Sequence, residues 1–348
     1  MARTAALLLA ALSMAEGLSP AGLGRRVQRQ PWRLAATVSS AAAAADLTTA
    51  GDSLTLSCPA KLNLFLRVVR RREDGFHDLA SLFQTLKLGD KLELAPLEAG
   101  AAADVLHCDT PGVPTDASNL VIKALDLFRE RAGVDTKFAA VLEKATPAEA
   151  GLGGGSSDAA AAMFGANKLC GYPATEAQLL EWSGEIGSDI SFFFSGGTAY
   201  CTGRGEIVEP VEPLPSPPDA VWLVKPPVGL STPRVFKALD LDARSTAAPE
   251  ELLAEFVAGG ARAGRLVNDL EQPAFDCIPE LGALKEQLGS DFGFDRVMMS
   301  GSGTTLFALG NPADEAAFVS FCESKDYFHC KTEFTQREAD SKDWYPTE

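Results

Sequence analysis

The chain has 348 residues, of which 46% are hydrophobic and 22% charged, the composition of an ordinary globular protein. This length suffices for one large or two medium-sized domains. The net charge of −16 argues against nucleic acid or an anionic membrane as a partner, and no apolar run reaches the roughly 18 residues of a membrane span. A phosphate site in such an acidic protein must be local, built from backbone N–H groups and a few cations.

Residues 1–45 differ in composition from the rest. They contain five arginines, one acidic residue (Glu16) and many Ala and Ser residues, as organelle targeting peptides do. Residues 5–12 form a short apolar core like that of a signal peptide. We therefore predict a cleaved organelle-targeting leader, of the bipartite plastid type if both signals act in sequence; a plain disordered tail is the alternative. Because this segment carries a net charge of +4, the remainder carries −20 against −16 for the whole chain.

The elements expected after the leader follow an α+β order, without strict strand–helix alternation. Strands are predicted at residues 53–69, 86–94 (with Gly89-Asp90 as a turn), 138–142, 221–224 and 296–299. Helices are predicted at residues 119–131, 157–170, 175–183, 235–239, 250–256 and 278–288. The proline-dense stretch 209–218 can continue neither a helix nor a central strand, so it is expected to separate a domain at 46–208 from one at 209–348. The seven cysteines lack C-x-x-C spacing, which indicates free thiols in a reducing compartment.

The most informative motif is G-L-G-G-G-S-S-D at residues 151–158, followed by A-A-A-A-M. Its glycines allow unusual backbone conformations and close approach of a ligand, and the alanines favour a helix. A glycine loop that opens a helix presents unpaired N–H groups and the positive end of the helix dipole to an anion. A tight connection without a ligand is the alternative. The motif is not a P-loop, because no Lys follows the glycines. It is not a dinucleotide-binding fingerprint either, because Ser156 stands where the third glycine belongs.

Three further segments accompany this loop: P-A-K-L-N-L-F-L at residues 59–66, I-G-S-D-I-S-F-F-F at 186–194 and S-G-S-G-T-T at 300–305. With these four motifs in order, the chain resembles the GHMP kinases over roughly residues 53–345. The resemblance implies an N-terminal domain like domain 2 of ribosomal protein S5, a ferredoxin-like C-terminal domain and an active site between them. It also implies ATP-dependent phosphorylation of an alcohol. Within the superfamily, the match implies as substrate a cytidine diphosphate-linked methylerythritol of the non-mevalonate isoprenoid pathway.

The resemblance also implies roles for individual residues. The loop is expected to cradle ATP, with Ser156 or Ser157 close to a phosphate or to Mg²⁺, and Asp158 is either a metal ligand or a carboxylate that complements the helix dipole. The residues of this predicted ATP site are Pro147, Gly151, Leu152, Gly153, Gly154, Gly155, Ser156 and Ser157. The second glycine loop comprises Gly301, Ser302, Gly303 and Thr304.

The expected catalytic pair is Lys61 and Asp189. Asp189 precedes an apolar run predicted as a strand, and its carboxylate would orient the substrate hydroxyl and accept its proton late. Lys61 lies in an apolar strand, where a cation needs a partner, and Asp189 and the hydroxyl would supply it. Asn63, on the same strand face, could hydrogen-bond the substrate.

The predicted base-binding residues are Phe76 and His77, with the imidazole reading the base edge of the substrate. Phe236 is the candidate for the ring opposite Phe76, and core packing is the alternative for both phenylalanines. Two other functions stay open: a kinase for a different small alcohol, against which the Phe76-His77 pair argues, and a nucleotide-binding sensor without catalysis, against which Lys61 and Asp189 argue.

Two residues depart from the family pattern. Glu149 stands in the cradle where the family has a small residue, and its charge would repel a triphosphate unless it points away or meets Mg²⁺. Ser191 replaces a proline after Asp189-Ile190, which questions the rigidity of that turn.

Overall fold

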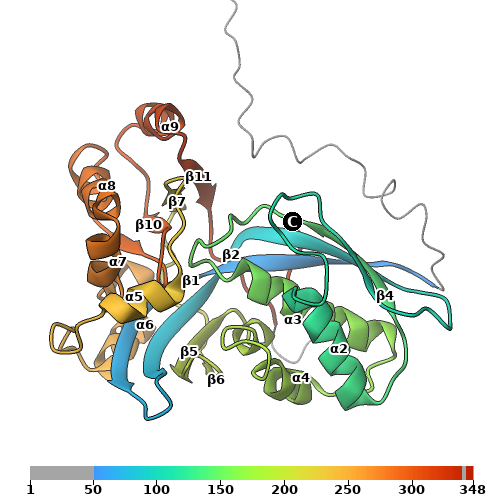
Figure 1. Ribbon diagram of the computed structural model, residues 1–348. Helices are drawn as coiled ribbons and strands as arrows, with labels where there is room; N and C mark the ends of the chain where they lie inside the picture. The colour runs from blue at the N-terminus through green and yellow to red at the C-terminus, as the bar shows by residue number, and fades with distance from the viewer. Residues whose placement is uncertain (1–50, 339–341, 348) are drawn as a thin grey trace, which may run out of the picture. The chain divides into compact units, whose positions relative to one another are not determined.

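The computed structural model describes residues 51–338 and 342–347, so the predicted leader at 1–45 lies outside them. The fold is α+β, as predicted, with a seven-stranded and a four-stranded sheet within these residues (Figure 1). Among the described residues, every helix is too short or too polar to cross a membrane.

The seven-stranded sheet is built around a long antiparallel hairpin of β1 (Leu54–Arg71) and β2 (His77–Pro96). The other strands are β3 (Val105–His107), β4 (Phe138–Glu143), β5 (Thr198–Gly203), β6 (Ile207–Pro210) and β8 (Val267–Asn268). The predicted turn at Gly89-Asp90 was wrong, because both residues lie inside β2. Gly89 is needed there because β1 passes so close that a Cβ would lie 2.8 Å from the Cα of Pro59.

Helix α3 (Gly154–Leu169) packs against this hairpin, and α2 (Leu120–Ala132) and α4 (Glu176–Ser183) pack against α3 and each other (Figure 1). Their ends follow from the sequence. Asn119 caps the N-terminus of α2 through its side chain, Gly133 ends the helix in a left-handed conformation, and Thr175 forms a capping box with Gln178 at α4.

The four-stranded sheet has the ferredoxin-like arrangement that the resemblance implied. Its order along the sheet is β11-β7-β10-β9, all antiparallel, and helices connect its first strand in the chain to the second and its third to the fourth, in the βαββαβ pattern. The strands are β7 (Val221–Lys225), β9 (Val297–Met299), β10 (Leu306–Leu309) and β11 (Phe328–Thr332). The helices are α5 (Thr232–Ala238), α6 (Pro249–Ala263), α7 (Glu271–Cys277), α8 (Pro279–Ser290) and α9 (Glu315–Ser324).

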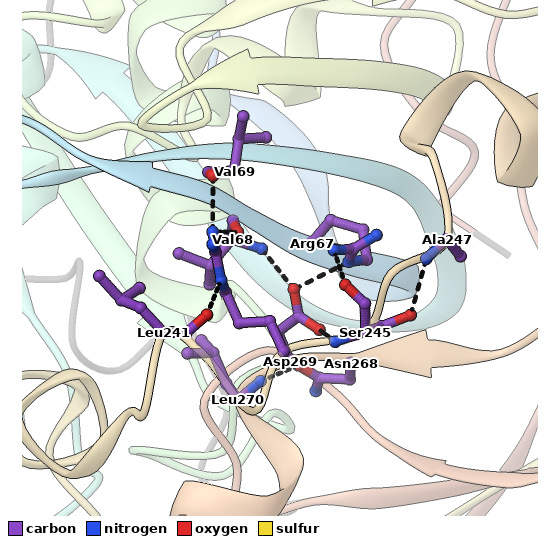
Figure 2. Close-up of polar contacts among 10 residues, drawn as sticks. Arg67, Val68, Val69, Leu241, Ser245, Ala247, Asn268, Asp269 and Leu270 are labelled. Atoms are coloured by element: carbon purple, nitrogen blue, oxygen red, sulfur yellow. Dashed lines mark hydrogen bonds and ion pairs between the residues drawn. The ribbon is translucent and has the colours of Figure 1, made fainter.

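The two sheets share a hydrophobic core in which Leu64 and Phe65 of β1 pack with Leu223 of β7 and Phe307 of β10. A buried ion pair reinforces the junction. Arg67 of β1 donates to Asp269, just after β8, at 2.8 Å, and the other Asp269 oxygen accepts from the backbone of the loop before α6 (Figure 2). This junction fixes β1, and with it the residues that β1 carries, relative to the second sheet.

The segment at residues 342–347 packs against the first core. Trp344 lies against Phe164 of α3 and donates its indole N–H to the carbonyl of Ser57 at 2.7 Å, while Tyr345 donates to the carbonyl of Ser195. The last part of the chain therefore completes the packing of its first strand and first helices.

Candidate active site

Lys61 lies in the middle of β1 and is almost completely buried. Its ammonium donates to Asn63 Oδ1 at 2.8 Å, lies 3.4 Å from Asp189 Oδ2 and sits 4.6 Å from the centre of the Phe83 ring. The structure thus brings together the two predicted catalytic residues and Asn63. The buried cation has the partners that its position requires.

Asp189 lies in a turn that leads into a 3-10 helix, η2 (Ser191–Phe194). The strand predicted there was wrong: η2 packs its phenylalanines into the first core, an environment that an apolar run can reach in either conformation. The carboxylate is about one-third exposed, so a ligand can reach it. Ser191 compensates for the missing proline, because its buried hydroxyl donates to the carbonyl of Leu180 at 3.1 Å and lies 3.1 Å from Ser183 Oγ.

The first glycine loop crosses directly over Lys61. The Lys61 N–H donates to the carbonyl of Leu152 at 2.8 Å, and a Cβ on Gly153 would lie 2.8 Å from the Lys61 side chain. Gly153 also has φ 71°, a conformation that favours glycine. Helix α3 begins at Gly154, earlier than predicted, and its N-terminus has no side-chain cap. Its first N–H groups are therefore of the kind that bind phosphate.

The second glycine loop packs against the first. Ser300 donates its hydroxyl to the carbonyl of Gly151 at 3.0 Å, and Gly301 approaches Asn63 so closely that a Cβ would lie 3.3 Å from its Oδ1. The Ser302 hydroxyl is hydrogen-bonded to the Thr232 hydroxyl at 2.8 Å. The Thr304 hydroxyl donates to the carbonyl of Val228 at 2.9 Å. Both glycine loops therefore meet beside Lys61 and Asn63.

Ser157 and Asp158 do not face the loop surface. Both are buried in α3, and the Ser157 hydroxyl has no hydrogen-bond partner within the described residues. Asp158 is paired with Lys144 at 2.6 Å, and Lys144 also donates to Asp90. Asp158 thus neither caps the helix nor is free for a metal; it belongs to a buried group of two carboxyl groups around one ammonium. Asp90 in turn accepts from the backbone N–H groups of Ala145 and Thr146, which fixes the chain just before the loop.

The buried carboxylates predict a pH dependence of stability. Burial, together with the charge of Asp90, raises the pKa of Asp158 to about 8. The folded state therefore holds a proton that the unfolded state loses above about pH 4, and Asp158 weakens the fold as pH rises from about 4 towards 8. We expect Asp158→Asn to gain stability over the wild type by about 1 kcal/mol per pH unit in this window.

Urea unfolding of both proteins at pH 5, 6, 7 and 8 measures this gain. Asp291→Asn is the matched control, because hydrogen bonds from Gln287 and Ser290 lower the pKa of this exposed carboxyl and the gain with pH should be absent. A constant difference between wild type and Asp158→Asn across the pH range would contradict the assignment.

The predicted base-binding residues come together at the start of β2. His77 stacks on Phe236 of α5, with ring centres 4.9 Å apart and planes 20° from parallel. Burial and the charges of Arg71 and Arg244 lower the pKa of His77, which keeps the imidazole neutral near pH 7. Phe76 is 56% exposed, and the group over its ring is the guanidinium of Arg204. Phe236 was predicted to lie opposite Phe76, but in the structure it stacks on His77.

The Glu149 side chain reaches the loop after β7. The residue is exposed, has φ 48°, and its carboxylate would collide with a Cβ on Gly229. Burial lowers the pKa of nearby Lys225, and the charge of Glu149 opposes that shift. The carboxylate thus lies beside the second sheet and close to a partly buried cation.

Glu149 lies two residues before Gly151 of the predicted cradle, so we expect Glu149→Gln to lower KM for ATP about two-fold by removing an exposed, water-screened charge near the phosphates. The effect on kcat should stay within about two-fold, since Glu149 lies outside the Lys61–Asp189 pair. Steady-state ATP titrations measure both, with the exposed Glu143→Gln as control. An unchanged KM would place the carboxylate outside the reach of the phosphates.

The site contains two polar residues that the sequence motifs did not predict. Asn268 donates to the carbonyls of Met299 and Gly301, both at 2.8 Å, and so holds the second glycine loop. Ser81 of β2 accepts a hydrogen bond from Asn63 at 2.8 Å. Asn268 could have been noticed in the sequence, because the polar pair Asn268-Asp269 lies outside the predicted strands and helices, whereas nothing in the sequence marks Ser81.

Across residues 51–338 and 342–347, no cluster of three or more acidic, His or Cys side chains could hold a metal ion.

The chain is similar in sequence to known proteins. Residues 119–197 match the GHMP kinases N terminal domain, and residues 250–325 match the GHMP kinases C terminal domain. The chain is 45% identical over 325 residues to the chloroplastic 4-diphosphocytidyl-2-C-methyl-D-erythritol kinase of Oryza sativa subsp. japonica, covering 92% of this chain and 80% of that protein.

Similarity extends to a bacterial protein and to a solved structure. The 4-diphosphocytidyl-2-C-methyl-D-erythritol kinase of Protochlamydia amoebophila (strain UWE25) is 46% identical over 269 residues, which is 77% of this chain and 88% of that protein. The crystal structure of a 4-(cytidine 5'-diphospho)-2C-methyl-D-erythritol kinase superposes with a TM-score of 0.67 at 32% identity, covering 81% of this chain and 99% of that one.

Proposed function

We propose that this chain, which belongs to the 4-diphosphocytidyl-2-C-methyl-D-erythritol kinase family of GHMP kinases, transfers the γ-phosphoryl group of ATP to the 2-hydroxyl of 4-diphosphocytidyl-2-C-methyl-D-erythritol. The reaction belongs to the non-mevalonate route to isoprenoids. The observation that carries the proposal is the convergence of Lys61, Asp189 and both glycine loops at one point.

Phosphoryl transfer to an alcohol requires an oriented nucleophile and compensation for the charge of the phosphates. Asp189, partly exposed and paired with Lys61, would accept a hydrogen bond from the substrate hydroxyl and take its proton as the O–P bond forms. Lys61 has three N–H donors, of which Asn63 and Asp189 take two. The third would stabilise negative charge on the transferred group.

The first glycine loop is our proposed ATP cradle. Its residues are Pro147, Gly151, Leu152, Gly153, Gly154, Gly155 and Ser156, with uncapped N–H groups at the start of α3. Ser157 is buried and Asp158 is paired, so of the predicted oxygen ligands only the half-buried Ser156 is accessible in the described part of the chain. With so few protein ligands, Mg²⁺ would be held chiefly by the phosphate oxygens of ATP. The ion would neutralise part of the phosphates' negative charge. The second loop, Gly301 to Thr304, would close the site from the other sheet.

We propose that the cytosine of the substrate binds at Phe76 and His77. A neutral imidazole can both donate and accept a hydrogen bond with a base edge, and the exposed ring of Phe76 offers a stacking face. Phe236 would then hold the His77 ring in place through their stack.

We place the protein in the plastid, because the rice relative is named chloroplastic and the first 45 residues have the composition of a targeting leader. We also propose a domain boundary near residue 209, where the proline-dense stretch begins.

An assay of the purified full-length protein tests the proposed function. ATP consumption should depend on the cytidine-linked substrate, and ³¹P NMR should detect a new phosphomonoester on its 2-hydroxyl. The matched controls are 2-C-methyl-D-erythritol 4-phosphate, which lacks the cytidine, and homoserine and mevalonate, which are other small alcohols. Equal turnover of any control would exclude the proposed substrate, and tight ATP binding without turnover would favour a nucleotide sensor.

A further inference from the structure

The orientation of the Asn63 side chain is determined by a serine from the neighbouring strand. Ser81 of β2 is 2% exposed, and its Oγ lies 2.5 Å from the carbonyl oxygen of Phe65 and 2.8 Å from Asn63 Nδ2. A β-bulge in β1 between Asn63 and Phe65 shifts the pairing with β2 at this point, and the serine hydroxyl lies there, against the Phe65 carbonyl.

The number of available protons determines which group donates in each of these two hydrogen bonds. A carbonyl oxygen can only accept, so the single hydroxyl proton of Ser81 goes to Phe65. Ser81 Oγ is then left as an acceptor, and it requires an N–H group from Asn63. The amide of Asn63 must therefore place its NH₂ group toward Ser81 and its carbonyl oxygen toward the ammonium of Lys61, 2.8 Å away.

We infer that Ser81 is a positioning residue for phosphoryl transfer: it fixes the amide of Asn63, which in turn holds Lys61 beside Asp189. The inference rests on the proposed function. Without the Ser81 acceptor, only the Lys61 ammonium orients the Asn63 amide, whose NH₂ group loses its partner, so the amide can swing away from Lys61. Lys61 would then lose one of the two oxygens that hold it, while the glycine loop that binds its backbone stays in place.

Kinetics of Ser81→Ala test this role. We expect kcat to fall about ten-fold, as for loss of about 1.4 kcal/mol in the transition state, with KM for ATP within about two-fold. Ser81→Thr keeps the donor and the acceptor and should restore most of the rate. The control is Thr198→Val, which removes another buried hydroxyl bond in the same sheet, Thr198 Oγ1 to Gln84 Oε1, and should leave kcat unchanged.

A double-mutant cycle separates positioning from general loss of stability. In an Asn63→Ala background, Ser81→Ala should cause no further loss of kcat, because the residue through which it acts is gone. Additive losses, or a Ser81→Ala enzyme with full kcat, would overturn the inference. If Ser81→Ala does not fold, Ser81→Cys preserves the size with a weak acceptor and should show the same selective loss of kcat. Absence of turnover in the wild type would instead refute the proposed function.

Discussion

Asp189→Asn is expected to lower kcat about 10²- to 10⁴-fold, the contribution usual for a positioned general base. The variant keeps the shape of the side chain and its place in the turn before η2, but its amide accepts a proton far less readily than a carboxylate. It also removes the negative partner that lies 3.4 Å from the buried ammonium of Lys61. Binding of ATP should persist, because both glycine loops are unchanged.

Single-turnover measurement of phosphoryl transfer, with ATP affinity measured separately by calorimetry, distinguishes these effects. Asp219→Asn is a suitable control, since this carboxylate is also paired with a cation, Arg262, but is exposed and lies outside both glycine loops. A rate for Asp189→Asn within about five-fold of the wild type would mean that the hydroxyl proton leaves by another route, and Asp189 would then serve only to hold Lys61.

Asp269→Asn is expected to destabilise the fold by about 3–5 kcal/mol, the usual cost of leaving one charge of a buried pair without its partner. Figure 2 shows why no rearrangement compensates. One oxygen of Asp269 accepts from the Arg67 side chain and the Val68 N–H, and the other accepts from the Ser245 N–H, all at 2.8–3.0 Å. Whichever way an asparagine turns, its NH₂ group must face a donor.

Urea denaturation gives the free energy of unfolding of this variant, provided that its m-value matches the wild type. Glu255→Gln is the contrasting control: it removes the acid of an exposed pair with Arg265, for which the loss of stability should be far smaller because water screens both charges. A similarly small loss for Asp269→Asn would mean that the Arg67 charge reaches water when its partner is removed. The loss predicted for Asp269 would consume a large part of the 5–15 kcal/mol by which domains are usually stable.

Much of the site could be predicted from sequence because the motifs act locally. The alternating strand around Lys61 and the glycines before α3 each specify their own backbone, so the strand, the helix and the close approach of Gly153 follow from nearby residues. The pairing of Lys61 with Asp189 came from family order and not from periodicity, and the structure places the two side chains within 3.4 Å.

What sequence could not supply depends on distant pairing. Three apolar residues, the phenylalanines at 192–194, are too few to distinguish a strand from a helical turn. The burial of Asp158 arises from contact with Lys144 and Asp90, which are brought to α3 by β2 and the chain before the loop. Ser81 meets Asn63 only because of the register of a hairpin and a bulge within it.

The packing of residues 342–347 on the first core bears on how the protein is made. Trp344 bonds to the carbonyl of Ser57, 287 positions earlier in the chain. A ribosome adds about 5–20 residues per second, so the strand around Ser57 is made well before the tryptophan that packs on it. Until then the apolar surface that Phe164 offers to Trp344 is uncovered. The amino-terminal half therefore reaches its full packing only after the segment at 342–347 has been made and has docked on it.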